Sequence, residues 1–203
     1  MFHITGFTDM GPIEVTKPPL IAIHPMGGNS DFWTDPATHM LNLPMMLQAA
    51  ASGFDVWLWN ARGTSYGLTH DEYDYTQPEF WDFTFFDIGT KDIAEMVRHV
   101  REVTGEKPSL FGYSQGTTNL LAGIAGAADF FGENANVIGL QAPCGVINKV
   151  YTEPIYKKEF IDFFKDNKIY VLGGPTPEIW EESKKIMCQV KELCDLIPSV
   201  DHL

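Results

Sequence analysis

The sequence reads SLFGYSQGTTNLLAGIAGAA from Ser109 to Ala128. At its centre, Gly112, Ser114 and Gly116 fit the pattern G-x-S-x-G, in which a serine occupies a strained turn and glycines two residues away avoid steric clashes. The apolar residues before the pattern predict a strand, and the small residues after it predict a helix packed closely on a sheet. A serine that only caps a helix does not require the flanking glycines. The stretch therefore predicts a strand-turn-helix elbow that presents Ser114 as a nucleophile.

On both sides of this elbow, predicted strands and helices alternate along the chain. Short apolar runs predict strands, and runs of helix formers with an apolar face or a closing glycine predict helices. This alternation predicts an α/β fold with a mostly parallel, doubly wound sheet. The predicted strands are residues 20–24, 54–59, 109–112, 136–141 and 168–172, and the predicted helices are residues 45–52, 92–103, 117–128 and 177–196.

The composition, with 44% hydrophobic and 13% aromatic residues, indicates a single globular domain over residues 1–203. Because the net charge is -13, most of the surface would repel a phosphate backbone, and we expect no nucleic-acid partner. The chain has no run of about 18 apolar residues. Its N-terminus lacks the basic, then apolar, then small residues that make up a secretory signal. We therefore predict neither a transmembrane segment nor a signal peptide, and the sequence indicates no particular compartment.

The cysteines of the chain are Cys144, Cys188 and Cys194. They are odd in number and show no metal-ligand spacing with each other or with histidines, so they indicate neither a disulfide framework nor a zinc site. We expect no metal and no cofactor.

An ester hydrolase needs backbone N–H donors for the oxyanion that forms during acyl transfer. One donor usually belongs to the residue after the nucleophile, and another lies in the loop after an earlier strand. Gln115 and Met26 occupy these two places, and Met26 lies in the glycine-rich segment His24-Pro25-Met26-Gly27-Gly28. The other interpretation of this segment is an ordinary turn at a strand end.

Several segments, in order, resemble the acid lipase family of α/β-hydrolases, which includes gastric and lysosomal acid lipases. Residues 53–64 (GFDVWLWNARGT) resemble the family's GYDVWLGNxRG segment, and residues 79–84 (EFWDFT) resemble its FWxFS segment. Residues 112–118 (GYSQGTT) resemble its GHSQGTT elbow, and residues 141–143 (QAP) resemble its LAP segment. The resemblance covers residues 20–155 and implies an α/β-hydrolase fold that acts on esters of lipids or on small esters.

The sequence also departs from the family. Pro25 and Gly27 stand where the family has HGLL, and because proline has no N–H, only Met26 or Gly27 can donate there. Tyr113 replaces the histidine that the family has beside its nucleophile. Family members are much longer, so the resemblance implies a fold truncated at its C-terminal side, with residues 156–203 as a cap-like or shortened region.

The catalytic acid and histidine of the family lie in a C-terminal part that this sequence does not contain. The chain order in this fold is serine, acid, histidine. The only histidine that follows Ser114 is His202, which is therefore the candidate base, with Glu178 or a nearby carboxylate as the acid. The alternatives are that His202 is an ordinary terminal residue or that a partner's histidine is the base. His24 precedes the serine, and we expect it to be a buried loop histidine that hydrogen-bonds the backbone.

These alternatives lead to different functions. The first is an esterase or lipase that forms an acyl-enzyme at Ser114. The second is a catalytically impaired or inactive truncated lipase-like domain that serves as a structural subunit of a larger complex. A third is a fragment or a split gene product whose second half supplies the acid and the histidine. A shortened sheet would expose an apolar edge, so we also predict a protein partner or an oligomer that covers it.

Arg62 and the aromatic residues near the FWxFS-like segment are expected to be structural. Their bulk suits core packing better than substrate recognition. These aromatic residues are Phe80, Trp81, Phe83, Phe85 and Phe86.

Overall fold

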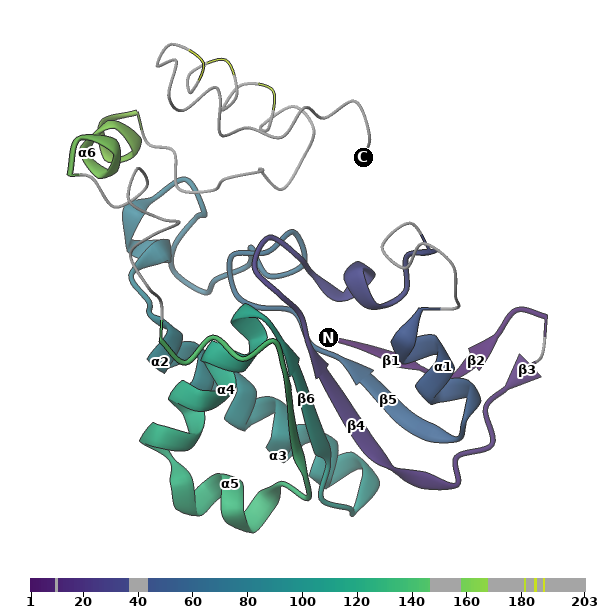
Figure 1. The fold of residues 1–203 in the computed structure, drawn as a ribbon. Coiled ribbons are helices and arrows are strands. Elements are labelled where there is room, and N and C mark those ends of the chain that lie inside the picture. The colour runs from purple at the N-terminus through teal and green to yellow at the C-terminus, as the bar shows by residue number, and fades with distance from the viewer. Residues whose placement is uncertain are drawn as a thin grey trace. The chain divides into compact units, whose positions relative to one another are not determined.

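The computed structural model describes residues 1–9, 11–36, 44–146 and 158–167, together with Glu181, Lys185 and Cys188. The chain divides into two compact units, one formed by residues 1–67 and 83–147 and the other by residues 68–82 and 148–203. The first unit contains the sheet and the helices around it (Figure 1).

A five-stranded sheet lies at the centre of the first unit. Its strands are β1 (Phe2–Ile4), β4 (Lys17–Ile23), β5 (Phe54–Leu58), β6 (Ser109–Tyr113) and β7 (Ile138–Gln141), in the order β1-β5-β4-β6-β7. Every neighbouring pair is parallel except β1 and β5. The prediction of a mostly parallel sheet is confirmed. The sequence did not predict β1 or the small hairpin of β2 (Gly6–Phe7) and β3 (Gly11–Pro12), because strands this short carry little periodicity.

Helices connect the parallel strands. The connection after β4 contains η1 (Ser30–Trp33) and α1 (Met45–Ala51), and the connection after β6 contains α4 (Gln115–Gly126) and α5 (Ala128–Asn134). Between β5 and β6, α2 (Phe85–Asp87), the π-helical segment η4 (Ile88–Ile93) and α3 (Ala94–Thr104) follow one another without a break. None of the described helices has the length and apolar character needed to cross a membrane.

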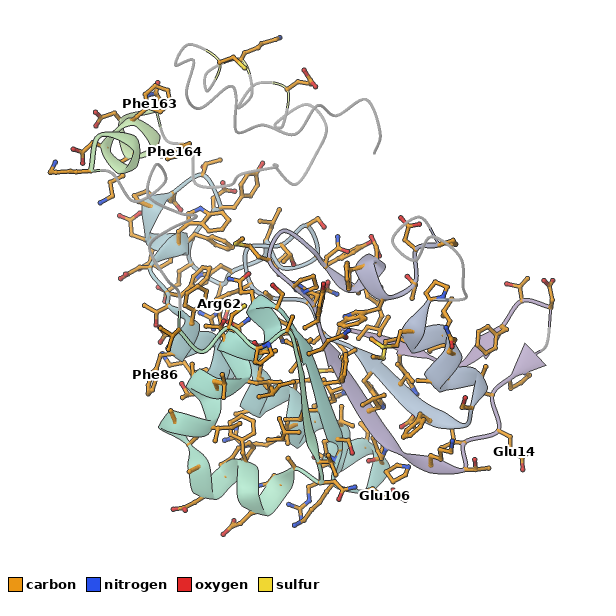
Figure 2. The ribbon with its side chains drawn as sticks, in the orientation of Figure 1. Glu14, Arg62, Phe86, Glu106, Phe163 and Phe164 are labelled. Carbon is orange, nitrogen blue, oxygen red and sulfur yellow. The ribbon has the colours of Figure 1, made fainter. Side chains whose placement is uncertain are left out.

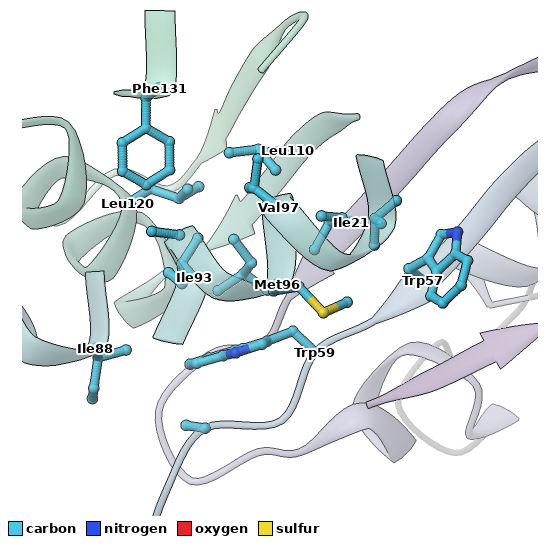
Figure 3. Close-up of a cluster of buried hydrophobic side chains, with 14 residues drawn as sticks. Ile21, Trp57, Trp59, Ile88, Ile93, Met96, Val97, Leu110, Leu120 and Phe131 are labelled. Carbon is cyan, nitrogen blue, oxygen red and sulfur yellow. The ribbon is translucent and has the colours of Figure 1, made fainter. Parts of the chain in front are cut away.

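Side chains alternate between the two faces of the sheet along each strand, and both faces carry apolar side chains that helices cover. On one face, Ile21 of β4 packs in a cluster with Val97 of α3, Leu120 of α4 and Phe131 of α5 (Figure 3). On the other face, the neighbouring Ala22 packs in a second cluster with residues of η1 and α1, which are Trp33, Met46 and Ala50. The sheet is therefore doubly wound, as the sequence predicts.

The sheet order places a topological switch point beside the elbow. Because β4 lies between β5 and β6, the chain leaves β4 toward one edge and later crosses to the other edge. In open α/β sheets, ligands bind at the carboxyl ends of the strands where this direction reverses. The loop after β4 carries Met26 and the turn after β6 carries Ser114, so both candidate residues lie at that point.

The described part of the second unit contains η3 (Pro78–Trp81) and α6 (Lys158–Asp166), where Phe163 and Phe164 are adjacent (Figure 2). Cys188 is disulfide-bonded. The sequence did not predict this bond, because an odd number of cysteines does not show which of them pair. The predicted strand at residues 168–172 lies outside the described residues, and so does the predicted helix at 177–196 except at three positions.

The structure corrects part of the prediction for the aromatic residues. Phe80 is buried in η3, and Phe83 packs against the cluster around Ile21. Trp81 is half-buried, and its indole N–H donates a hydrogen bond to a backbone carbonyl oxygen. The prediction of core packing is wrong for Phe85 and Phe86, which are exposed on the short α2, a helix with no buried residue. Figure 2 shows Phe86 at this position.

Candidate active site

Ser114 joins β6 to α4 in a backbone conformation that non-glycine residues rarely adopt. Its φ is 52° and its ψ is -119°, and among the described non-glycine residues only Ala142 also has a positive φ. Such conformations cost about 1–3 kcal/mol and persist where the surrounding structure holds them. The strained elbow that the sequence predicts at Ser114 is confirmed.

The glycines on either side of Ser114 are required by close packing. A Cβ atom on Gly112 would come within 2.9 Å of the Gly116 carbonyl oxygen and 2.8 Å of the Leu120 side chain. A Cβ atom on Gly116 would lie 2.9 Å from the carbonyl oxygen of His24 and closer still to that of Ile23. The first turn of α4 therefore lies directly against the end of β4. Any residue other than glycine at position 116 would require the backbone to move.

Hydrogen bonds hold the backbone on both sides of Ser114. The Ser114 N–H donates to the carbonyl oxygen of Gln141, at 3.0 Å between nitrogen and oxygen. The Ser114 carbonyl oxygen accepts from both the N–H of Thr117, at 2.9 Å, and the Thr117 hydroxyl, at 2.6 Å. The Ser114 hydroxyl makes no hydrogen bond with any other described residue.

Met26 and Gln115 lie at equivalent places beyond two paired strands. Ile23 of β4 pairs with Gly112 of β6, and Met26 and Gln115 each follow three residues later. A hydrogen bond from the Gly28 N–H to the Pro25 carbonyl oxygen closes the loop around Met26. Neither Met26 N–H nor Gln115 N–H donates to another described residue, so both remain available for an oxyanion.

His24 connects the loop after β4 to the loop after β5. The Ala61 N–H donates to His24 Nε2, at 3.1 Å, which leaves the ring proton on Nδ1 to donate to the Pro25 carbonyl oxygen, at 2.9 Å. The ring is buried against Trp59, and this burial lowers the pKa of His24. The expectation of a buried histidine bonded to the backbone is confirmed.

We expect the buried His24 to make the protein less stable in acid. The unfolded chain takes up a proton at an ordinary pKa of about 6.5, whereas the folded chain resists it, so the stability that His24 contributes is present above that pH and is lost as the pH falls. In urea unfolding between pH 8 and pH 5, the free energy of unfolding should decline less steeply for His24→Gln than for the wild type. His99→Gln, at an exposed position, controls for the loss of an imidazole, and equal slopes for wild type and His24→Gln would contradict the expectation.

A second set of contacts fixes the loop after β5. Asn60 Oδ1 accepts from the Ser30 N–H, at 2.8 Å, and the Asn60 amide donates to the Ser30 hydroxyl. Arg62 donates twice to the carboxylate of Asp92 and lies over the ring of Phe83, and its hydrogen bond to Asp92 raises the pKa of the guanidinium. The structural role expected for Arg62 is confirmed.

The other members of the predicted triad lie outside the described residues. These are His202 and Glu178. Within the described ranges, no histidine or carboxylate side chain hydrogen-bonds Ser114, and no group of three or more His, Cys, Asp or Glu side chains could hold a metal ion. The sequence interpretation missed Thr117, because a threonine in the first turn of a helix shows no sign of its partners until the neighbouring loop is placed.

Curated lipases of several eukaryotes are similar to this chain in sequence. Triacylglycerol lipase 1 of Arabidopsis thaliana is 29% identical over 189 residues, which are 92% of this chain and 45% of the plant protein. Lipase lipl-5 of Caenorhabditis elegans is 32% identical over 116 residues, which are 57% of this chain and 27% of the worm protein. The chain thus spans less than half the length of the curated relatives it matches.

A comparison with protein-family models gives no match. Among solved structures, the mature form of the Bacillus licheniformis lipase BlEst2 is similar to this chain with a TM-score of 0.42 and 16% sequence identity. The similar region covers 77% of this chain and 63% of the bacterial one.

Proposed function

We propose that this chain, a lipase-like member of the α/β-hydrolases, hydrolyses carboxylic esters with Ser114 as its nucleophile. The observation that carries the proposal is the strained Ser114 between β6 and α4, whose hydroxyl is unpaired among the described residues. Its place at the switch point of the sheet adds support, because substrates of this type of sheet bind there. The names of the relatives support esters of lipids as the substrate class.

The proposed reaction proceeds through an acyl-enzyme. The Ser114 oxygen attacks the ester carbonyl carbon while a base takes the hydroxyl proton. The carbonyl oxygen becomes an oxyanion and accepts hydrogen bonds from the N–H groups of Gln115 and Met26. The base then gives the proton to the leaving alcohol as the ester C–O bond breaks, and a water molecule hydrolyses the acyl-enzyme by the same steps.

We propose His202 as the base and Glu178 as the acid that orients it. His202 is the histidine that follows Ser114 in the chain order of this fold. Among the described histidines, His3 and His24 are bonded to Asp55 and to backbone groups, and His70 accepts two backbone N–H groups. His99 lies on α3 with its ring beside Trp57. None of the four hydrogen-bonds Ser114, which supports a base from outside the described ranges. A fluorophosphonate probe tests the chemistry directly, since it reacts much faster with an activated serine than with an ordinary hydroxyl.

In this experiment the purified full chain is incubated with the probe, and the modified residue is identified by peptide mass spectrometry. We expect a single adduct at Ser114 in the wild type and a large drop in labelling for His202→Ala. A folded wild-type protein that stays unlabelled would contradict the proposed function. Full labelling of His202→Ala would leave Ser114 as the nucleophile but exclude His202 as its base.

We also propose that a second polypeptide chain covers the edge of the sheet at β7. Among the described residues, β7 pairs on one side only, with β6, and Val137 and Leu140 are exposed. Residues 136–147 contain no charged side chain, so this edge lacks the charges with which sheets usually prevent edge-to-edge pairing.

Light scattering tests this assembly. We expect the purified chain by itself to have a mass above the 22.8 kDa of one copy at micromolar concentration. Leu140→Lys should lower the mass to that of one copy, whereas Val103→Lys, at an exposed position on α3, should not. A wild-type chain that is a stable monomer at micromolar concentration would contradict the proposal.

A further inference from the structure

The Thr117 side chain bonds to both sides of the elbow and is fully buried. Its hydroxyl donates to the Ser114 carbonyl oxygen, at 2.6 Å, and accepts from the Cys144 N–H, at 2.9 Å. We propose that Thr117 is a positioning residue that aims the Gln115 N–H at the oxyanion. This inference rests on the proposed function of Ser114 and Gln115.

One peptide group links the Ser114 carbonyl oxygen to the Gln115 N–H. The Ser114 carbonyl and the Gln115 N–H belong to the same planar trans peptide, so they point in opposite directions. Two donors from Thr117, its N–H and its hydroxyl, hold the Ser114 carbonyl oxygen. Whatever fixes that oxygen also fixes the direction of the Gln115 N–H, which is the donor that the reaction uses.

The two hydrogen bonds from Thr117 to the Ser114 carbonyl oxygen, together with the bond from the Cys144 N–H to the Thr117 hydroxyl, form what we call the Thr117 clamp. The clamp is needed because the peptide that it holds follows a strained residue. With φ at 52°, Ser114 is in a backbone conformation that is unfavourable for a non-glycine residue, so its own torsional preferences do not hold it there. Small rotations about its backbone bonds would turn the Gln115 N–H away from the oxyanion. The preceding peptide is held as well, by the bond from the Ser114 N–H to the Gln141 carbonyl oxygen.

The same clamp reaches a second strained residue. Ala142, with φ at 49°, lies between Gln141 and Cys144, which bond to Ser114 and Thr117 respectively. Within the described part of the chain, the two non-glycine residues with positive φ therefore belong to one hydrogen-bonded unit. Thr118 adds a hydrogen bond from its hydroxyl to the Cys144 carbonyl oxygen, at 2.9 Å, and this hydroxyl does not bond to Ser114.

Three variants separate positioning from stability. Thr117→Val keeps the shape of the side chain but removes the hydroxyl, Thr117→Ser keeps the hydroxyl, and Thr118→Val removes a hydroxyl that holds only the loop. Hydrolysis of p-nitrophenyl butyrate is measured well below the melting temperature of each variant. Because an oxyanion contact forms in the transition state, we expect Thr117→Val to lower kcat by about tenfold to a hundredfold with KM changed by less than about twofold.

The controls should stay close to the wild type. We expect kcat of Thr117→Ser and Thr118→Val to remain within about threefold of the wild-type value. A Thr117→Val enzyme with normal kcat, or an equal loss in Thr118→Val, would overturn the positioning role. If Thr117→Val does not fold, Thr117→Cys replaces it, because a thiol fills similar space but donates weakly.

Amide hydrogen exchange distinguishes failure of this inference from failure of the proposed function. If the hydroxyl of Thr117 holds the Cys144 N–H, exchange at Cys144 should be about tenfold or more faster in Thr117→Val than in Thr117→Ser. If the wild type has no esterase activity but the two variants differ in exchange at Cys144 as expected, the proposed function is refuted and the hydrogen bonds of the Thr117 clamp are supported. Equal exchange in the two variants would refute the clamp itself.

Discussion

Replacing Ser114 with alanine is expected to abolish fluorophosphonate labelling and to lower kcat/KM for ester hydrolysis by about a thousandfold or more. The variant keeps the fold and the backbone N–H groups of Met26 and Gln115, but no oxygen remains to form the acyl-enzyme. Hydrolysis of p-nitrophenyl butyrate by the purified variant, with its melting temperature measured alongside, gives the comparison. An alanine variant that retained wild-type activity would exclude Ser114 as the nucleophile.

Ser114→Gly is the matched variant, because it is equally inactive but relieves the backbone. Glycine adopts a positive φ at no steric cost, whereas alanine keeps the strain of the serine. Although glycine also gains freedom in the unfolded chain, we expect Ser114→Gly to be more stable than Ser114→Ala by about 1 kcal/mol in urea unfolding. A glycine variant less stable than the alanine variant would show that the elbow stores no strain.

The sequence predicted the elbow and the parallel strands for clear physical reasons. A buried parallel strand is a continuous apolar run, and a strained serine needs small neighbours, so both appear as short local patterns. Gly112 and Gly116 are a good example, since the structure shows that a Cβ at either position would meet backbone atoms. The burial of His24 and its hydrogen bonds to the backbone could also be predicted locally, because a histidine at the end of a buried strand has backbone groups within reach.

Contacts between distant segments could not be predicted in this way. β1 pairs with β5 across more than fifty residues, and its three residues carry no pattern of their own. The Thr117 clamp depends on where Cys144 lies, and the sequence alone does not place that loop. The exposure of Phe85 and Phe86 depends on how the short α2 packs beside α4 and η4, whereas their bulk alone favoured the core.

Gly116→Ala is expected to destabilise the protein strongly although it adds only one methyl group. The added Cβ would lie 2.9 Å from the His24 carbonyl oxygen and closer to that of Ile23, and both are backbone atoms at the buried end of β4. Neither can move without displacing the central strand. We expect the free energy of unfolding to fall by about 3 kcal/mol, measured by urea unfolding.

Gly132→Ala is the control for Gly116→Ala, because it adds the same atom to another helical glycine. Gly132 lies in α5, and a Cβ there would have no heavy atom within 4 Å. Alanine favours the helix over glycine by up to about 1 kcal/mol, so this variant should be as stable as the wild type or more so. If Gly116→Ala is as stable as Gly132→Ala, α4 does not pack closely against β4. The contact that brings the loops of Gln115 and Met26 together would then be absent.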